Sequence, residues 1–251
     1  MKIDRRKILF MIIGAIAVVV ALFGVGKIVQ VMTTPSVDTA EGVELIQTEE
    51  AQDVQSIEAK IQEMEAQEKA DEEADAKRTN KQKFVNSVVM GDSIAYSFAE
   101  YDVLDASSVV AKIGVSIVSI DEDLATVEQM VPDAIFLSYG MNDITNTNGD
   151  AQVYREQYKS VIDELKKELP NSRIFVNSIF PVQQKVLAEQ PEFENLAQYN
   201  EMLSELCDEE KITFIDNTSL VEEKYYEPDG IHFVAEFYPI WADRMAEVAS
   251  L

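Results

Sequence analysis

Short apolar runs alternate with longer amphipathic stretches from about residue 83 to residue 251. Five of these runs are rich in β-branched and aromatic residues: Phe84–Met90, Ser108–Gly114, Ala134–Gly140, Arg173–Phe180 and Ile212–Thr218. They show little polar alternation, which is typical of strands that are buried on both faces. The pattern therefore predicts five strands that are buried on both faces of a sheet.

Apolar residues between these runs recur at helical spacing. One stripe extends from Val153 to Leu169 and another from Leu196 to Glu210, and a final helix is expected to begin near Pro239. Alternating strands and helices favour right-handed βαβ units, which place helices on both faces of a parallel sheet. The sequence predicts one three-layer α/β/α domain over residues 83–251.

Residues 1–32 carry a different pattern. No charged residue occurs from Ile8 to Gly26, and a helix of this length, at about 1.5 Å per residue, nearly covers the hydrocarbon core of a bilayer. Basic residues precede it: Lys2, Arg5, Arg6 and Lys7. This charge bias predicts a single-pass signal anchor with a cytoplasmic N-terminus and an extracytoplasmic domain at the cell membrane. A cleaved signal peptide is the alternative, although the apolar run is long and no small-x-small cleavage motif follows it.

Residues 33–82 form an acidic stretch rich in Glu, Gln and Ala. Val54, Ile57, Ile61 and Met64 follow a heptad-like spacing over about two heptads. This segment is interpreted as a stalk, either a solvated helix or a partly disordered spacer. Weak dimerisation through the apolar seam is a further hypothesis.

Composition narrows the class of function. The chain has 47% hydrophobic and 27% charged residues, which suits a globular core, and its net charge of −25 argues against nucleic-acid binding. Its single cysteine, Cys207, excludes an intrachain disulfide and a cysteine-rich zinc site. The helical pattern around Cys207 indicates a buried structural thiol.

The candidate catalytic residues lie where the predicted strands end. This is expected, because reactive loops gather at the carboxyl ends of parallel strands. Ser93 follows the first strand in a Gly-Asp-Ser turn, Gly114 ends the second, and Asn142 follows the third. After the fifth strand come Asp229 and the only histidine, His232. A carboxylate three residues before an imidazole can orient the ring, whose other nitrogen then accepts a serine proton.

This order of motifs resembles the SGNH (GDSL) hydrolase family over about Phe84 to Leu251. The resemblance rests on Gly91–Ser93, Gly114, Gly140–Asp143 and Asp229–His232, and it departs at Ile94, where the family usually has leucine. It implies a flavodoxin-like fold and serine esterase or acyl-transfer chemistry. Ser93 would then be the nucleophile, His232 the general base and Asp229 its orienting partner. The oxyanion hole would consist of the Ser93 and Gly114 N–H groups and the Asn142 amide.

The leading interpretation is an esterase that removes acyl groups, first of all acetyl, from cell-envelope glycans without a metal or organic cofactor. The alternatives are an O-acyltransferase that works with a membrane acyl donor, a lipase or thioesterase, and a silent glycan- or protein-binding domain. Asp92 and Asp143 are interpreted as structural. Pro181–Leu196 is either a rim or lid over the site or an ordinary surface loop. Four aromatic residues are assigned either to a pocket or to the core: Tyr139, Tyr225, Tyr226 and Phe233.

Overall fold

The computed structural model describes residues 57–69, 77–147 and 149–251. The chain divides into two units, Met1–Glu73 and Ala74–Leu251. In the first unit, residues 57–69 are helical and Met64 is exposed. No helix in the described ranges combines the length and apolar character that a membrane span requires. The predicted span from Ile8 to Gly26 and the seam residue Val54 lie outside these ranges, and dimerisation stays a prediction.

The second unit contains the five predicted strands. They are β1 (Ser87–Gly91), β2 (Val109–Ala111), β3 (Ala134–Ser138), β4 (Arg173–Asn177) and β5 (Thr213–Ile215). They form a parallel sheet in the order β2-β1-β3-β4-β5. This is the strand order of flavodoxin-like folds, so the predicted α/β class and five-stranded parallel sheet are confirmed. Every residue of β1 and β3 is buried, which explains their nearly continuous apolar sequences.

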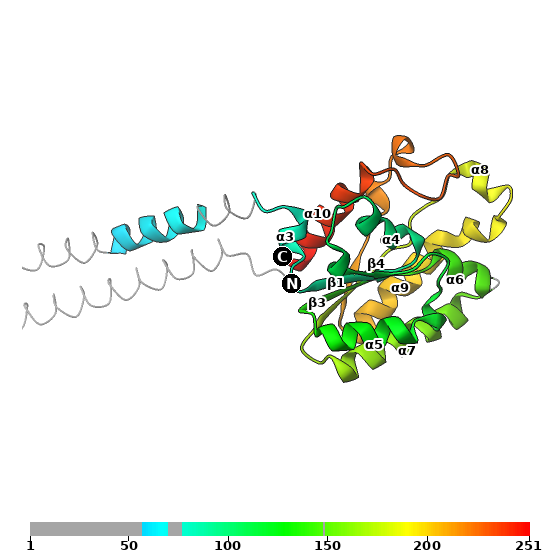
Figure 1. Ribbon diagram of the computed structural model, residues 1–251, viewed down its shortest axis with the longest axis horizontal. Helices are drawn as coiled ribbons and strands as arrows, with labels where there is room; N and C mark the ends of the chain where they lie inside the picture. Colours follow the sequence, from blue (N-terminus) through cyan, green and yellow to red (C-terminus); the bar gives the residue numbers. More distant parts are fainter. Residues whose placement is uncertain (1–56, 70–76, 148) are drawn as a thin grey trace, which may run out of the picture. The chain divides into compact units, whose positions relative to one another are not determined.

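Helices connect the strands on both faces of the sheet (Figure 1). The α-helices are α3 (Asn80–Lys83), α4 (Ser93–Glu100), α5 (Asp121–Met130), α6 (Met141–Asn146), α7 (Ala151–Glu168), α8 (Gln184–Leu187), α9 (Leu196–Glu210) and α10 (Phe237–Ala249). Short 3-10 helices are η1 (Ala106–Ser108), η2 (Ile117–Ser119), η3 (Pro191–Asn195), η4 (Thr218–Leu220) and η5 (Glu223–Tyr225). Helices α5, α7 and α9 cover one face, and α4 and α10 cover the other.

The observed boundaries refine the expected ones. Each strand is shorter than its apolar run. In the first and fourth runs the remainder lies in buried loops, since Phe84 and Phe180 are in the core outside the strands, whereas Ile113 beyond β2 is exposed. The final helix begins at Phe237, which places Pro239 in its first turn, where a missing N–H costs little. Helix α3 packs against α10, and Asn80 Nδ2 donates to the Pro239 carbonyl. This short helix therefore belongs to the α/β unit.

An aromatic cluster lies between α4, α10 and the sheet. The Trp241 ring lies 4.6 Å from the Phe98 ring and 4.8 Å from the Phe180 ring, measured between centroids. Phe233 stacks on Phe237 at 4.2 Å. Phe233 is fully buried and directly follows His232, so the core anchors the loop that carries the only imidazole of the chain. Close ring packing of this kind stabilises beyond simple area burial.

A buried polar network closes the carboxyl end of β4. Asn177 Oδ1 accepts hydrogen bonds from Asn217 Nδ2 at 2.9 Å and from Trp241 Nε1 at 3.2 Å, and its own amide donates to the Leu137 carbonyl. The network ties β4 to β3, to the segment after β5 and to α10. Its members are nearly or fully buried, so removing the shared acceptor would leave donors without water as a substitute.

We expect Asn177→Leu to lower the free energy of unfolding by about 2–4 kcal/mol, since two buried N–H donors lose their acceptor. Urea denaturation monitored by far-UV circular dichroism measures this loss. Asn171→Leu, the same change at an exposed position, is the control and should alter stability by no more than about 0.5 kcal/mol. Equal stabilities of the two variants would show that the network contributes little.

Candidate active site

Ser93 is the first residue of α4, directly beyond the carboxyl end of β1. Asp92 caps this helix, and its carboxylate accepts a hydrogen bond from the Ile94 N–H at 3.0 Å. Gly91 makes the turn possible, because a Cβ at this position would lie 2.5 Å from the Ser138 carbonyl oxygen and from the Ala95 Cβ. The Gly-Asp-Ser sequence thus presents the Ser93 hydroxyl where N–H groups of the first helical turn are unused by the helix itself.

The structure brings Ser93, His232 and Asp229 into one chain of hydrogen bonds. The Ser93 Oγ lies 2.9 Å from His232 Nε2. The other ring nitrogen of His232, Nδ1, lies 2.5 Å from Asp229 Oδ2. Asp229 can therefore hold the imidazole with Nδ1 protonated, which leaves Nε2 free to accept the serine proton.

The Asp229 carboxylate is fixed by its own loop. Its Oδ1 accepts hydrogen bonds from the N–H groups of Ile231 and His232, at 2.9 and 3.0 Å. Partial burial alone would raise the pKa of Asp229, but these bonds and the His232 ring together lower the pKa below its ordinary value. Gly230 supplies the turn, with φ of +81°, a conformation that side chains with a Cβ rarely adopt. The carboxylate is thus ionised and aimed at the imidazole near neutral pH.

The three expected oxyanion donors lie on neighbouring strand ends. Gly114 follows β2 in an exposed loop, with φ of +75°. Asn142 lies in the first turn of α6, after β3, and its Nδ2 donates to the Val115 carbonyl at 2.9 Å. This bond links Asn142 to the loop of Gly114, while β1 lies between β2 and β3. Strand order therefore places the three expected residues at the carboxyl ends of adjacent strands, where ligand sites of open α/β sheets lie.

Two buried aspartates connect the same loops. Asp92 accepts from the N–H groups of Ile94 and Met141, and Asp143 accepts from the Ile117 N–H at 2.7 Å. Burial raises the pKa of Asp92 to about 7, with Asp143 adding to the shift, and burial raises the pKa of Asp143 to about 6. Both carboxylates face backbone amides and join the β1, β2 and β3 loops. These contacts agree with the structural interpretation of both residues.

The first half of the segment Pro181–Leu196, which follows β4, is neither a free lid nor an isolated surface loop. The Gln183 N–H donates to the Gly230 carbonyl at 2.9 Å, and Lys185 Nζ donates to the Pro228 carbonyl at 2.6 Å. A Cβ on Gly230 would lie 2.7 Å from Lys185 Cε, so the two segments are in close contact. These two hydrogen bonds could not be predicted from the sequence, because no local pattern indicates a contact between residues more than 40 positions apart.

The aromatic residues near the motifs belong mainly to the core. Tyr139 and Phe233 are buried, at 2% and 0% exposure, and therefore do not line an open pocket. Tyr225 and Tyr226 are half-buried and pack on Phe237 and Phe233. The site itself is open, since the His232 side chain is 36% exposed and that of Asp229 is 44% exposed.

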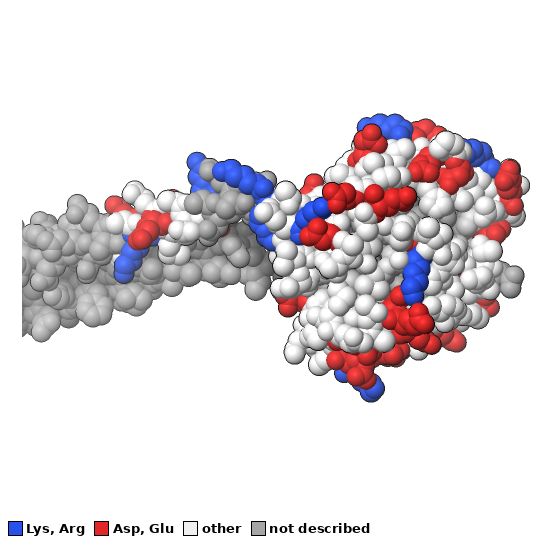
Figure 2. Space-filling model, in the orientation of Figure 1, with Lys and Arg blue, Asp and Glu red and all other residues white. Residues whose placement is uncertain are grey.

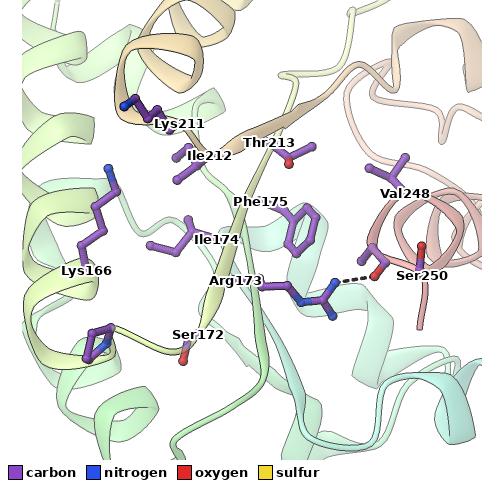
Figure 3. A pocket seen from close by; sticks show the side chains of 12 residues that line it. Lys166, Ser172, Arg173, Ile174, Phe175, Lys211, Ile212, Thr213, Val248 and Ser250 are labelled. Atoms are coloured by element: carbon purple, nitrogen blue, oxygen red, sulfur yellow. Dashed lines mark hydrogen bonds between the residues drawn. The ribbon is translucent and has the colours of Figure 1, made fainter. Parts of the chain in front are cut away.

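A cavity of about 440 Å³ lies elsewhere, at the amino ends of β4 and β5 (Figure 3). Its basic side chains are Lys166, Arg173 and Lys211. Lys166 Nζ bonds the carbonyl and carboxylate of Glu210, and Arg173 Nη1 donates to the Ala249 carbonyl. Two of the three cations thus neutralise the carboxyl ends of helices, and we assign them a structural role. None of the five expected site residues lines this cavity.

Cys207 is buried, and burial raises the pKa of its thiol to about 12, which agrees with an inert structural thiol. Within residues 57–69, 77–147 and 149–251, no cluster of three His, Cys, Asp or Glu side chains is arranged to hold a metal ion. On most of the face shown in Figure 2, basic side chains lie singly beside acidic ones.

Comparison with known proteins identifies the class. The GDSL-like Lipase/Acylhydrolase family matches residues 89–240, more than half of the chain, and the chain belongs to this family. The match begins within β1, before Ser93, and ends beyond His232 in α10, so it contains every strand-end motif described above. The resemblance inferred from those motifs is therefore confirmed.

Solved structures share the fold. A protein from Streptococcus pneumonia is 22% identical, with a TM-score of 0.54, and the match covers 79% of this chain and 98% of that one. A GDSL-like lipase from Bacteroides thetaiotaomicron is 16% identical, with a TM-score of 0.53 and coverage of 73% and 96%. An acetyl esterase mutant with acetate ion is 12% identical, with a TM-score of 0.52 and coverage of 65% and 95%. No curated protein matches the chain.

The buried Asp92 leads to a prediction about pH and stability. Its pKa is 3.8 in the absence of structure and about 7 in the fold, so folding binds a proton between these values. Stability should therefore fall as the pH rises through this window. Asp92→Asn keeps an oxygen acceptor for the Ile94 N–H but carries no charge. Its stability relative to the parent should increase by about 2–3 kcal/mol from pH 5 to pH 8.

Urea denaturation of both proteins at pH 5, 6, 7 and 8 measures this difference. Asp133→Asn, the same change at an exposed aspartate, is the matched control and should show no comparable widening. A difference between Asp92→Asn and the parent that stays constant with pH would contradict the raised pKa.

Proposed function

We propose that the chain is a serine esterase that removes acetyl groups from extracytoplasmic glycans. The observation that carries this proposal is the hydrogen-bonded chain from Ser93 through His232 to Asp229. The serine hydroxyl is a weak nucleophile unless a neighbouring base accepts its proton. His232 lies at the distance that this transfer needs, and membership of an acylhydrolase family supports the same chemistry.

In the proposed reaction, Ser93 Oγ attacks the ester carbonyl while His232 Nε2 takes the hydroxyl proton. The tetrahedral oxyanion accepts hydrogen bonds from the N–H groups of Ser93 and Gly114 and from the Asn142 amide. His232 then returns the proton to the departing alcohol, which leaves an acyl-enzyme on Ser93. Water, deprotonated by His232, releases the carboxylic acid and restores the serine.

Three observations support a substrate that is polymeric, weakly charged and acetylated. The site is open, with His232 36% exposed, so a long chain can cross it without entering a tunnel. The net charge of −25 disfavours densely anionic polymers by long-range repulsion. One structure with the same fold is described as an acetyl esterase with acetate ion, a likeness in fold alone. An O-acetylated neutral glycan satisfies these conditions.

The location of the site in the domain fits a tethered enzyme. The chain enters the α/β unit through α3, at the amino ends of the strands, while Ser93 and Asn142 follow their carboxyl ends (Figure 1). The apolar run from Ile8 to Gly26 supports our proposal of a single-pass anchor with a cytoplasmic N-terminus. Under this proposal the residues between the anchor and α3 are a spacer, and the site lies at the end of the strands opposite to α3.

The first experiment measures hydrolysis of p-nitrophenyl acetate by the 251-residue chain and by Ser93→Ala and His232→Ala. We expect kcat to fall by about 10⁴ or more in both variants, because nucleophile and base act as one unit. Ser119→Ala, the same change at an exposed serine, is the control and should keep full activity.

Labelling by a fluorophosphonate, which reacts with activated serines, tests the same point without a chosen substrate. A folded parent that neither hydrolyses the ester nor takes the label would overturn the serine mechanism. Activity on p-nitrophenyl palmitate above that on O-acetylated xylan would instead retain the mechanism and reject the glycan.

The Asn142 amide gives a separate prediction. Asn142→Ala should lower kcat by about 10²–10³ and leave KM nearly unchanged, because the lost donor acts on the oxyanion that forms in the transition state. Steady-state kinetics with p-nitrophenyl acetate measures both constants. Asn146→Ala, at an exposed position on the same helix, is the matched control. A rise in KM alone would assign Asn142 to substrate binding instead.

A further inference from the structure

The loop that carries His232 is closed across its base. Tyr226 and Phe233 form an antiparallel bridge, and the Glu227 N–H donates to the His232 carbonyl at 2.8 Å. Glu227 therefore lies directly opposite His232 across the loop. Any contact that holds Glu227 also restrains the backbone from which the imidazole projects.

The Glu227 side chain reaches α4. Its carboxylate accepts a hydrogen bond from the Tyr101 hydroxyl at 2.9 Å, a bond between a neutral donor and a charged acceptor. This bond raises the pKa of Tyr101 to about 12, so the phenol keeps its proton at physiological pH. The Tyr101 ring packs 5.2 Å from the Tyr238 ring of α10, which holds it independently of the hydroxyl.

Helix α4 thus contacts the His232 loop at both of its ends. Ser93 is the first residue of α4 and lies against His232 Nε2, whereas Tyr101 is the C-cap and bonds Glu227. These ends are about 12 Å apart at 1.5 Å per residue. One bond alone would act as a pivot, while two separated links fix both the position and the tilt of the loop relative to the helix. The Gln183 and Lys185 contacts brace the loop from another segment.

We propose that Tyr101 and Glu227 are a positioning pair that sets the distance between His232 Nε2 and Ser93 Oγ. The inference rests on the proposed roles of His232 and Ser93. Neither Tyr101 nor Glu227 touches the reacting atoms; Glu227 acts through the His232 backbone, and Tyr101 acts through Glu227. Serine–imidazole transfer is sensitive to such placement, because small displacements of reacting groups cost large factors in rate.

The kinetic test uses Tyr101→Phe, which removes only the hydroxyl and keeps the ring on Tyr238. We expect kcat for p-nitrophenyl acetate to fall roughly tenfold with KM within about twofold of the parent. Glu227→Ala should match this loss, and Glu227→Gln, which retains an oxygen acceptor, should recover most of the activity. The double variant Tyr101→Phe/Glu227→Ala should be no worse than Glu227→Ala, since both remove the same bond. Tyr96→Phe, an exposed tyrosine on the same helix, is the matched control.

The single histidine allows a second readout that needs no turnover. In the chain labelled with ¹⁵N-histidine, the only imidazole signals come from His232. Exchange of its Nδ1 proton with solvent should be roughly fivefold faster in Tyr101→Phe and Glu227→Ala than in the parent and Tyr96→Phe, because the loop opens more often.

The outcomes separate the two proposals. Parent-like kcat and parent-like Nδ1 exchange in Tyr101→Phe would overturn the positioning pair, even in an active esterase. An inactive parent would overturn the proposed function, and the exchange measurement would still decide whether Tyr101 and Glu227 hold the His232 loop. A rise in KM with unchanged kcat would assign the pair to substrate binding and contradict the proposal.

Discussion

The hydrogen bond between Ser93 and His232 joins residues 139 positions apart, and the architecture of the α/β unit maintains it. Ser93 is held by β1, an interior strand of the parallel sheet, and by the capped start of α4. His232 is held by a loop near the end of the chain, whose next residue, Phe233, is fully buried among the aromatic rings of α10. The packing of α10 on α4 therefore helps to hold the two side chains together, with the hydrogen bonds that the His232 loop receives from Lys185 and Tyr101. Trp241 and Phe98, in contact between these helices, lie at the centre of that packing.

Two buried carboxylates near Ser93 hold the surrounding loops together. Asp92 and Asp143 lie inside the domain and accept hydrogen bonds from backbone amides of three separate loops. Burial raises both pKa values, and this shift is the free-energy cost of placing carboxylates there. In return the loops after β1, β2 and β3 are joined to one another. The proposed oxyanion donors Gly114 and Asn142 belong to the joined loops, and preorganised donors are the most effective form of transition-state stabilisation.

Some parts of the fold could be predicted from the sequence in more detail than others. The five strands and the helix from Leu196 to Glu210 were predicted from apolar runs and periodicity, because burial leaves a direct imprint on residue type. The expectation that all five strands are buried on both faces is wrong for β2 and β5, because these are the edge strands and are only partly buried. The residues at which the strands end could not be predicted as closely. The apolar run Arg173–Phe180 continues beyond β4, because Ile179 and Phe180 enter the core from a loop. The aromatic residues near the motifs were ambiguous for a similar reason, since a buried ring and a ring lining a pocket have the same one-letter code.

The sequence by itself determined the fold class and the order of the motifs, since both depend on local spacing and on residue types that tolerate few substitutes. A single histidine three residues after an aspartate could be recognised without coordinates. The tertiary structure decided which distant groups meet: His232 against Ser93, Gln183 and Lys185 against the loop of Gly230, and Tyr101 against Glu227. These contacts arise from helix packing and chain reversal rather than from neighbours in the chain. Interactions of this kind leave no periodic signal, because each is made once, between residues that the fold alone brings together.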